Sequence, residues 1–168
     1  MEKIFTEENG CYKIDCSRAI WATDQLHLQY IDTNSVLSDV DWIMETNRKI
    51  YLVEYKNADI PDASNPMAFR PADDGKINKV AKKFYDSLHY LNLLGKTKPK
   101  EYIYILEYPN GDSTSRRMIR NLLKSKLPFA LQENIGNGKK IIDSVNVFSI
   151  EEWNADPQYG QFPIQPVQ

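Results

Sequence analysis

Residues 38–57 have the sequence SDVDWIMETNRKIYLVEYKN, which predicts two β-strands joined by a tight turn. Apolar and aromatic residues alternate with their neighbours on both sides of a polar segment, Thr46–Lys49, and this period of two is the signal of a strand. Asn47 and Arg48 are expected to form the loop, because asparagine tolerates the backbone conformation that a short hairpin requires. The stretch therefore predicts a β-hairpin with a two-residue loop.

The register of this hairpin brings three charged side chains together. With Asn47 and Arg48 as the loop, Asp41 lies opposite Glu54. Directly opposed residues on one face of a sheet have Cβ atoms about 4.5–5.5 Å apart. Lys56 follows two residues after Glu54 and therefore projects from the same face. Two carboxylates and one ammonium group are expected at one end of the hairpin.

Such a group of charges favours one kind of chemistry. Two neighbouring carboxylates repel each other, and when buried they persist only with a counter-charge or a metal ion. Hard oxygen ligands suit Mg²⁺ (or Mn²⁺), which keeps several water molecules when one or two carboxylates bind it. A lysine beside the ion can orient or deprotonate a water molecule if its pKa is lowered. The predicted chemistry is metal-assisted hydrolysis of a phosphodiester.

The order Asp41, twelve intervening residues and Glu54-Tyr55-Lys56 resembles the core motif of the PD-(D/E)xK nuclease superfamily. The spacing is also similar to that of archaeal Holliday-junction resolvases within that superfamily. The resemblance implies that the metal ligands are Asp41, Glu54 and the backbone carbonyl of Tyr55. It also implies that Lys56 assists the attacking water.

The motif departs from the family pattern at one position and leaves one alternative open. Val40 stands where the name of the motif has proline, a substitution that the family often shows. Asp39 is a second candidate for the first carboxylate, although the register places it opposite Lys56. The resemblance is specific over residues 36–57 and only architectural from there to about residue 150. It implies an α/β (α+β) fold with a restriction-endonuclease-like core, a mixed sheet of four or five strands flanked by helices.

The segments after the hairpin have clear patterns. Apolar residues at helical spacing predict a helix over residues 76–94, and a continuous apolar run predicts a central strand over residues 101–108. A second helix ending near Lys126 and a last strand over residues 144–150 are also expected. That second helix is predicted to bury Met118, Ile119, Leu122 and Leu123. Residues 57–75 are rich in turn formers, and a loop of this length can cover a site or contact a substrate.

The two ends of the chain have weaker patterns. Residues 17–24 are expected as a short helix, and residues 26–30 as a strand or as a continuation of that helix. Many nucleases of the superfamily place another acidic residue near the metal, and the candidates here are Glu7, Glu8, Asp15 and Asp24. A single domain is predicted over residues 1–153. Residues 154–168 contain three prolines and no basic residue, which predicts a tail that packs loosely or is disordered.

Charge is unevenly distributed along the chain. Residues 1–75 carry a net charge of −7, residues 76–140 carry +9, and residues 141–168 carry −4. A basic middle segment beside an acidic site is typical of a protein that holds phosphates with one region and a metal with another. Charged helices that present ordinary solvent-exposed faces explain the pattern equally well. The candidate nucleic-acid-binding residues are Lys76, Lys79 and Lys83 on the first helix and Arg116, Arg120 and Lys124 on the second.

Length and composition exclude several classes of protein. A chain of 168 residues suits one domain, and no apolar stretch approaches the roughly 20 residues of a membrane span. The first residues lack the features of a signal peptide, and Cys11 and Cys16 are expected as reduced thiols, so a cytoplasmic location without a membrane partner is predicted.

Three classes of function remain after these exclusions. The leading prediction is a Mg²⁺-dependent endo- or exonuclease, with DNA as the expected substrate and a homodimer as one expected state, since many members of the superfamily dimerise. The first alternative is a fold relative that binds nucleic acid or a partner protein without cutting. The second is an α/β protein outside the superfamily, in which the charges of the hairpin are simply solvated.

Overall fold

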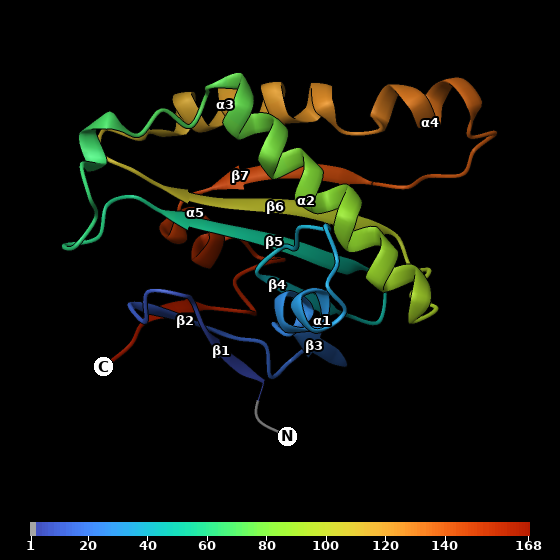
Figure 1. Ribbon diagram of the computed structural model, residues 1–168, viewed down its shortest axis with the longest axis horizontal. Helices are drawn as coiled ribbons and strands as arrows, with labels where there is room; N and C mark the ends of the chain where they lie inside the picture. The colour runs from blue at the N-terminus through green and yellow to red at the C-terminus, as the bar shows by residue number, and fades with distance from the viewer. Residues whose placement is uncertain (1–2) are drawn as a thin grey trace.

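The computed structural model describes residues 3–168 and is built on a mixed five-stranded sheet with the strand order β3-β4-β5-β6-β7 (Figure 1). Strand β4 is antiparallel to both of its neighbours, β3 and β5, whereas β5, β6 and β7 run parallel. The predicted α+β class and the mixed sheet are therefore confirmed. The strands are Trp21–Thr23 (β3), Trp42–Glu45 (β4), Ile50–Asn57 (β5), Lys100–Glu107 (β6) and Ser144–Phe148 (β7).

Different elements cover the two faces of this sheet. Helix α2 (Asp74–Leu93) crosses one face, where α1 (Leu26–Asp32) and α3 (Ser113–Lys126) contribute to the same core (Figure 1). Helix α5 (Ile150–Ala155) and a small second sheet cover the other face. The second sheet has the order β1-β2-β8, with strands Ile4–Thr6, Tyr12–Asp15 and Ile164–Pro166. A short α4 (Phe129–Ile135) follows α3, and a 3₁₀ turn (Pro66–Ala68) lies in the loop before α2.

The predicted hairpin register is confirmed. Met44 pairs with Tyr51 and Trp42 pairs with Val53, and the Thr46 amide donates to the Lys49 carbonyl across the loop (2.8 Å). Alternation along β5 then divides its side chains between the two cores, so that Ile50 and Leu52 lie beneath α2 while Tyr51 and Val53 face the second sheet. Glu54, two residues beyond Leu52, therefore faces α2.

The alternation of side chains between the two faces of the sheet is interrupted just before β4. Val40 packs in the core beneath α2 together with Ile43, although strict alternation predicts it on the same face as Trp42. The cause is a hydrogen bond from the Val40 amide to the Ser87 hydroxyl of α2 (3.1 Å), which draws the backbone out of the strand ladder.

The first helix and the central strand agree with prediction, but the second helix is rotated about its axis. Helix α2 ends at Leu93 and is followed by Gly95, whose φ of +66° suits glycine, and β6 pairs with β5 in parallel. In α3, Ile119 and Leu123 are buried as predicted, whereas the prediction that Met118 and Leu122 are buried is wrong because both are exposed. Buried Arg116 takes the remaining inward position.

The N-terminal prediction is partly wrong. Residues 21–23 form strand β3 rather than the end of a short helix, and residues 26–32 form α1, one of the two alternatives. Backbone pairing with β4 favours the strand, a long-range contact that a local pattern does not carry. No helix within residues 3–168 is both long and apolar enough to cross a membrane.

The prediction of a loosely packed C-terminal tail is also wrong. Tyr159, Phe162 and Ile164 are buried, and β8 pairs with β2. The indole of Trp153 donates to the Phe162 carbonyl (2.7 Å), and the Asn154 side chain bonds both backbone groups of Ile164. The rings of Tyr159 and Phe162 both pack against Tyr51 of β5, a long-range contact that a local apolar period does not carry.

The packing of this segment predicts a large effect of truncating one ring. Phe162→Ala is expected to lower the free energy of unfolding by about 3–5 kcal/mol, because Phe162 is fully buried and its removal leaves a cavity. Urea denaturation measures the change. Val167→Ala, at a 41% exposed position in the same segment, is the matched control and should change it by less than about 0.5 kcal/mol. Equal stability of the two variants would contradict the packing.

Candidate functional site

The two carboxylates of the predicted motif lie together beneath α2. Asp41 precedes β4, and its Oδ2 accepts a hydrogen bond from the backbone amide of Tyr55 (2.7 Å). Glu54 lies in β5 and is only 6% exposed. The charge of Asp41 helps to raise the pKa of Glu54, as expected for neighbouring carboxylates. Glu54 is therefore not a solvated surface charge, whereas Lys56 of the same motif is exposed.

The ammonium group beside these carboxylates comes from α2 and not from the hairpin. Lys83 Nζ lies 2.7 Å from Glu54 Oε1. Lys83 was a candidate for phosphate binding on an outer helix face, but its head group points inward to Glu54. The cause is geometric, because α2 crosses the face of the sheet onto which Glu54 projects.

One oxygen of Glu54 has no partner. Within residues 3–168, Glu54 Oε2 is the one buried side-chain oxygen or nitrogen without a hydrogen bond. Buried polar atoms are almost always paired, so such an atom marks a place for a ligand. The Tyr55 carbonyl faces the same region, because the N–H and C=O groups of one strand residue point to the same side and the Tyr55 amide points to Asp41.

The electrostatics of the site favour an additional positive charge. Burial raises the pKa of Glu54 well above its ordinary value, and the Asp41 charge raises it further. Burial also raises the pKa of Asp41, although Lys83 and the Tyr55 amide oppose this effect. Burial lowers the pKa of Lys83, but the two carboxylates outweigh it and the net shift is upward. Two carboxylates and one ammonium group leave a deficit of one positive charge, which a proton or a cation can supply.

Helix α2 also fixes the segment that carries Asp41. Asp86 Oδ2 accepts a hydrogen bond from the Ser38 amide (2.7 Å), and Ser87 Oγ accepts one from the Val40 amide (3.1 Å). The sequence prediction missed both residues. A signal existed for Ser87, which falls three residues after Phe84 on the predicted buried stripe, where a serine needs a hydrogen-bond partner.

A cleft of about 500 Å³ opens beside Asp41 and Lys83. Of the N-terminal acidic candidates, Glu7, Glu8 and Asp24 line this cleft, and Asp15 is not among the lining residues. The Glu7 carboxylate is already engaged by the backbone amides of the following turn, at 2.6 Å from the Cys11 nitrogen. Glu7 therefore has a local structural role.

Asp39 and Lys56 do not meet. Asp39 lines the first cleft, and its Oδ1 lies 3.2 Å from His27 Nδ1 on α1. Lys56 is exposed and lines a second cleft, walled by the loop that precedes α2. The structure thus separates the lysine of the motif from the cleft that contains Asp41.

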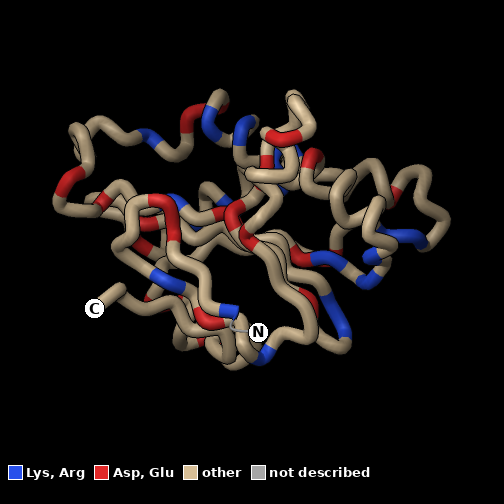
Figure 2. Tube along the Cα trace, turned by 60° about the horizontal axis from the view of Figure 1, so that its bottom comes forward, with Lys and Arg blue, Asp and Glu red and all other residues tan. Residues whose placement is uncertain are grey.

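The remaining basic candidates do not form a continuous stripe. Lys76 lies over the Phe69 ring, Lys79 is exposed, and Lys124 lies over Phe129. Figure 2 shows Lys and Arg positions distributed over several elements rather than gathered along one helix face. The candidate residues therefore occupy separate places on the surface.

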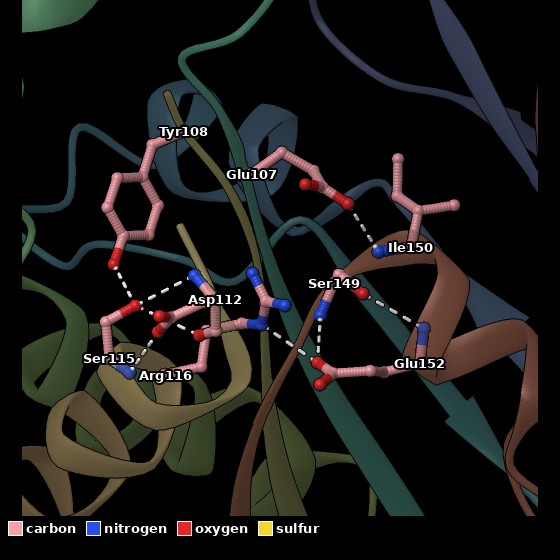
Figure 3. Close-up of polar contacts among 8 residues, drawn as sticks. All are labelled: Glu107, Tyr108, Asp112, Ser115, Arg116, Ser149, Ile150 and Glu152. Carbon is pink, nitrogen blue, oxygen red and sulfur yellow. Dashed lines mark hydrogen bonds and ion pairs between the residues drawn. The ribbon is translucent and has the colours of Figure 1, made fainter. Parts of the chain in front are cut away.

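Arg116 is a correction to the expected stripe on α3. It is 8% exposed, and its Nε lies 2.8 Å from Glu152 Oε2, which also accepts from the Ser149 amide at the start of α5 (Figure 3). Arg120, one turn later, donates to Asn121 (3.1 Å). Arg116 joins α3 to α5, so its charge is not available to a phosphate.

A divalent ion fits the residues that are present. No three His, Cys, Asp or Glu side chains within residues 3–168 gather as a metal-ligand set. Mg²⁺, however, is commonly held by only one or two carboxylates, with water and substrate completing its shell. Asp41, the unpartnered Oε2 of Glu54 and the Tyr55 carbonyl match that smaller requirement. Comparison with protein-family models, curated proteins and solved structures finds no match to this chain.

The role of Lys83 as the counter-charge can be tested by removing it. Lys83→Met is expected to lower the free energy of unfolding by about 3 kcal/mol at neutral pH, because two buried carboxylates lose their partner. The loss should shrink in acid. A carboxyl whose pKa is raised in the folded state contributes stability while protonated, and this contribution disappears as the pH rises through that pKa.

The matched control is Lys79→Met, an exposed lysine one turn earlier on α2. Denaturation with and without MgCl₂ compares the two variants. Mg²⁺ should stabilise the Lys83 variant more than the wild type, since the ion then meets less positive charge. Equal behaviour of both variants would contradict the assignment.

Ser87→Ala tests the support of Asp41. The variant leaves the buried Val40 amide without its acceptor, which costs about 1–3 kcal/mol of stability. Mg²⁺ affinity, measured by calorimetry, should fall because the Asp41 segment is released. Ser125→Ala, at an exposed serine on α3, should leave stability and affinity unchanged. Unaltered Mg²⁺ affinity in the Ser87 variant would show that Asp41 is held by other contacts.

Proposed function

We propose that this chain is a divalent-metal-dependent nuclease of the restriction-endonuclease-like type, acting on phosphodiester bonds in DNA. The observation that carries the proposal is the buried pair of Asp41 and Glu54, in which Glu54 Oε2 has no partner. Burying two carboxylates is costly, and Lys83 supplies only one positive charge, so a bound cation would compensate the pair further. The hairpin register that places both residues together supports the family resemblance of the motif.

The donor set suits Mg²⁺ or Mn²⁺. Asp41, Glu54 Oε2 and the Tyr55 carbonyl are oxygen donors on one side of the hairpin, and hard cations prefer oxygen. When bound, such an ion supplies Lewis acidity toward a phosphoryl group and lowers the pKa of water. Because Lys83 engages Glu54 Oε1, the other oxygen stays available and the ion need not displace the lysine.

The two lysines have different positions relative to the carboxylates. Lys83 neutralises part of their charge and orients the Glu54 carboxylate, so we assign it as a positioning residue. Lys56 keeps the position from which the resemblance has a lysine act on water, two residues beyond Glu54 on the same face of β5. Its exposed side chain lines the neighbouring cleft, where substrate would be met first.

A second candidate function is binding of nucleic acid without cleavage. Lys56 and Lys76 of the second cleft favour it, because they need no metal to attract phosphates. The carboxylate pair favours cleavage, since a binding surface gains nothing from two buried negative charges. Divalent-metal binding separates the two functions.

The test is a cleavage assay on linear, single-stranded and branched DNA, and on RNA, with Mg²⁺ or Mn²⁺. Asp41→Asn and Glu54→Gln should each lower the rate by about 10²–10³-fold, because each removes a charged donor at the reacting centre. Lys139→Met, at an exposed lysine outside both clefts, should cut at the wild-type rate.

Calorimetry on the same proteins measures Mg²⁺ binding directly. The wild type should bind the ion, and both carboxylate variants should lose that binding. Cleavage that persists in Asp41→Asn and Glu54→Gln would expose a contaminating enzyme. A wild-type protein that neither cuts any substrate nor binds a divalent ion would overturn the proposal in favour of the non-catalytic function.

A further inference from the structure

The second cleft differs in charge from the first. It has a volume of about 570 Å³, and its lining includes two lysines, Lys56 and Lys76, and one carboxylate, Asp62. The first cleft is lined by five carboxylates, one lysine and one histidine. A polyanion gains attraction from ammonium groups and repulsion from carboxylates over distances of a few ångströms. The second cleft is therefore the one that suits a chain of phosphates.

Both lysines of this cleft are free to bind an anion. Within residues 3–168, no carboxylate lies within ion-pairing distance of Lys56 or Lys76, whereas Lys49, Lys83 and Lys96 are all paired. An unpaired ammonium group has a compact charge and three donors, which suit a phosphate oxygen. Lys56 and Lys76 are thus not committed to the fold.

An aromatic ring holds one of them at the cleft. Lys76 Nζ lies 4.1 Å from the centroid of the Phe69 ring, and Phe69 in turn packs edge-on against Tyr108. A cation over an aromatic face is attracted by about 0.5–1 kcal/mol at an exposed site. This contact orients the ammonium group without neutralising its charge, which preorganises it for an anion. Phe69 and Lys76 both line the cleft.

The cleft also adjoins the carboxylate pair. Lys56 follows Glu54 by two residues on one strand, and side chains so related lie about 6.6 Å apart along the same face. A phosphate held by Lys56 would thus lie near the carboxylate pair. The loop of residues 57–73, which contains the 3₁₀ turn, forms the wall of the cleft.

We infer that the second cleft binds the sugar-phosphate backbone of a single nucleic-acid strand through Lys56 and Lys76, beside the carboxylate pair. Strand binding here rests on the proposed nuclease function for its purpose, but it does not require metal or catalysis. Lys56 acts in this inference as a phosphate-binding residue. Phe69 is a positioning residue, because it acts on the strand through Lys76.

The test measures binding of the full-length protein to a fluorescein-labelled single-stranded DNA of about 12 nucleotides. Binding is monitored by fluorescence anisotropy, and EDTA is present to remove divalent metal ions. The double variant Lys56→Gln/Lys76→Gln should weaken binding on the order of tenfold at about 50 mM salt. The slope of log affinity against log salt should fall by about 1.4, since each phosphate contact on a single strand contributes about 0.7. Lys139→Gln, at an exposed lysine outside the cleft in the loop after α4, is the matched control.

A second variant tests the orientation of Lys76. Phe69→Leu keeps an apolar side chain but removes the aromatic ring. When Lys76 is present, this substitution should weaken DNA binding several-fold. It should have no further effect once Lys76→Gln is present, a dependence that a merely structural role of Phe69 would not produce. Thermal melting of each variant checks that the fold is retained.

The outcomes separate this inference from the proposed function. Equal loss of binding in the Lys139 control, or unchanged binding in the double variant, would overturn the cleft assignment, even where the protein cuts DNA. Displacement of the oligonucleotide by inorganic phosphate at equal phosphate concentration would also overturn it, because that result indicates a simple anion site. If the protein binds the oligonucleotide through Lys56 and Lys76 but cuts no substrate, the result would support this inference and overturn the proposed nuclease function.

Discussion

Alternation along β5 is the constraint on which the rest of the structure depends. Each residue of this central strand must face either α2 or the second sheet, and the parity of the hairpin register leaves no choice. Leu52 packs beneath α2 for this reason, and Glu54 is carried to the same side. The apolar pattern that forms the core thus forces a carboxylate into it. The site exists because the regular alternation along β5 places Glu54 on the same buried face as Leu52.

Helix α2 places three polar residues beside this pair, Lys83 on one turn and Asp86 and Ser87 on the next. Lys83 supplies a counter-charge to Glu54, while Asp86 and Ser87 hold the backbone that leads to Asp41. One helix therefore sets both the charge and the geometry of the pair. The compensation is incomplete, since one oxygen of Glu54 stays without a partner. A buried atom of this kind lowers stability, and such a cost is usually accepted where a ligand completes the site.

The surroundings of the pair divide into two clefts of opposite charge. Carboxylates from the N-terminal hairpin and the segment before β4 line the first, which favours cations. Lysines from β5 and α2 line the second, which favours anions. In the function proposed above, a metal ion and a phosphate chain would thus be attracted to separate clefts. The net charge of the whole protein is only −2, so it does not reveal this arrangement, in which acidic and basic residues come from different parts of the chain.

The sequence by itself determined the features that depend on neighbours in the chain. The hairpin register, the buried stripe of α2 and the opposition of Asp41 and Glu54 all follow from periods of two or 3.6 residues. Strand β3 could not be predicted from a local pattern, since its pairing with β4 is a long-range contact. The same is true of the C-terminal segment, where Phe162 fills a gap made by residues from the start of the chain.

Only the tertiary structure decided which charged groups meet. Arg116 and Lys83 have the spacing of solvent-exposed residues, yet each turns inward because a carboxylate from a distant element lies there. Lys56 has the position of the motif lysine, yet its side chain opens into a different cleft from Asp41. Long flexible side chains take the direction that pairs their charge, and that direction depends on contacts far apart in sequence. The periodicity of the sequence determines on which face of a helix or strand a residue lies. The position of α2 across the sheet determines which charged group that side chain contacts.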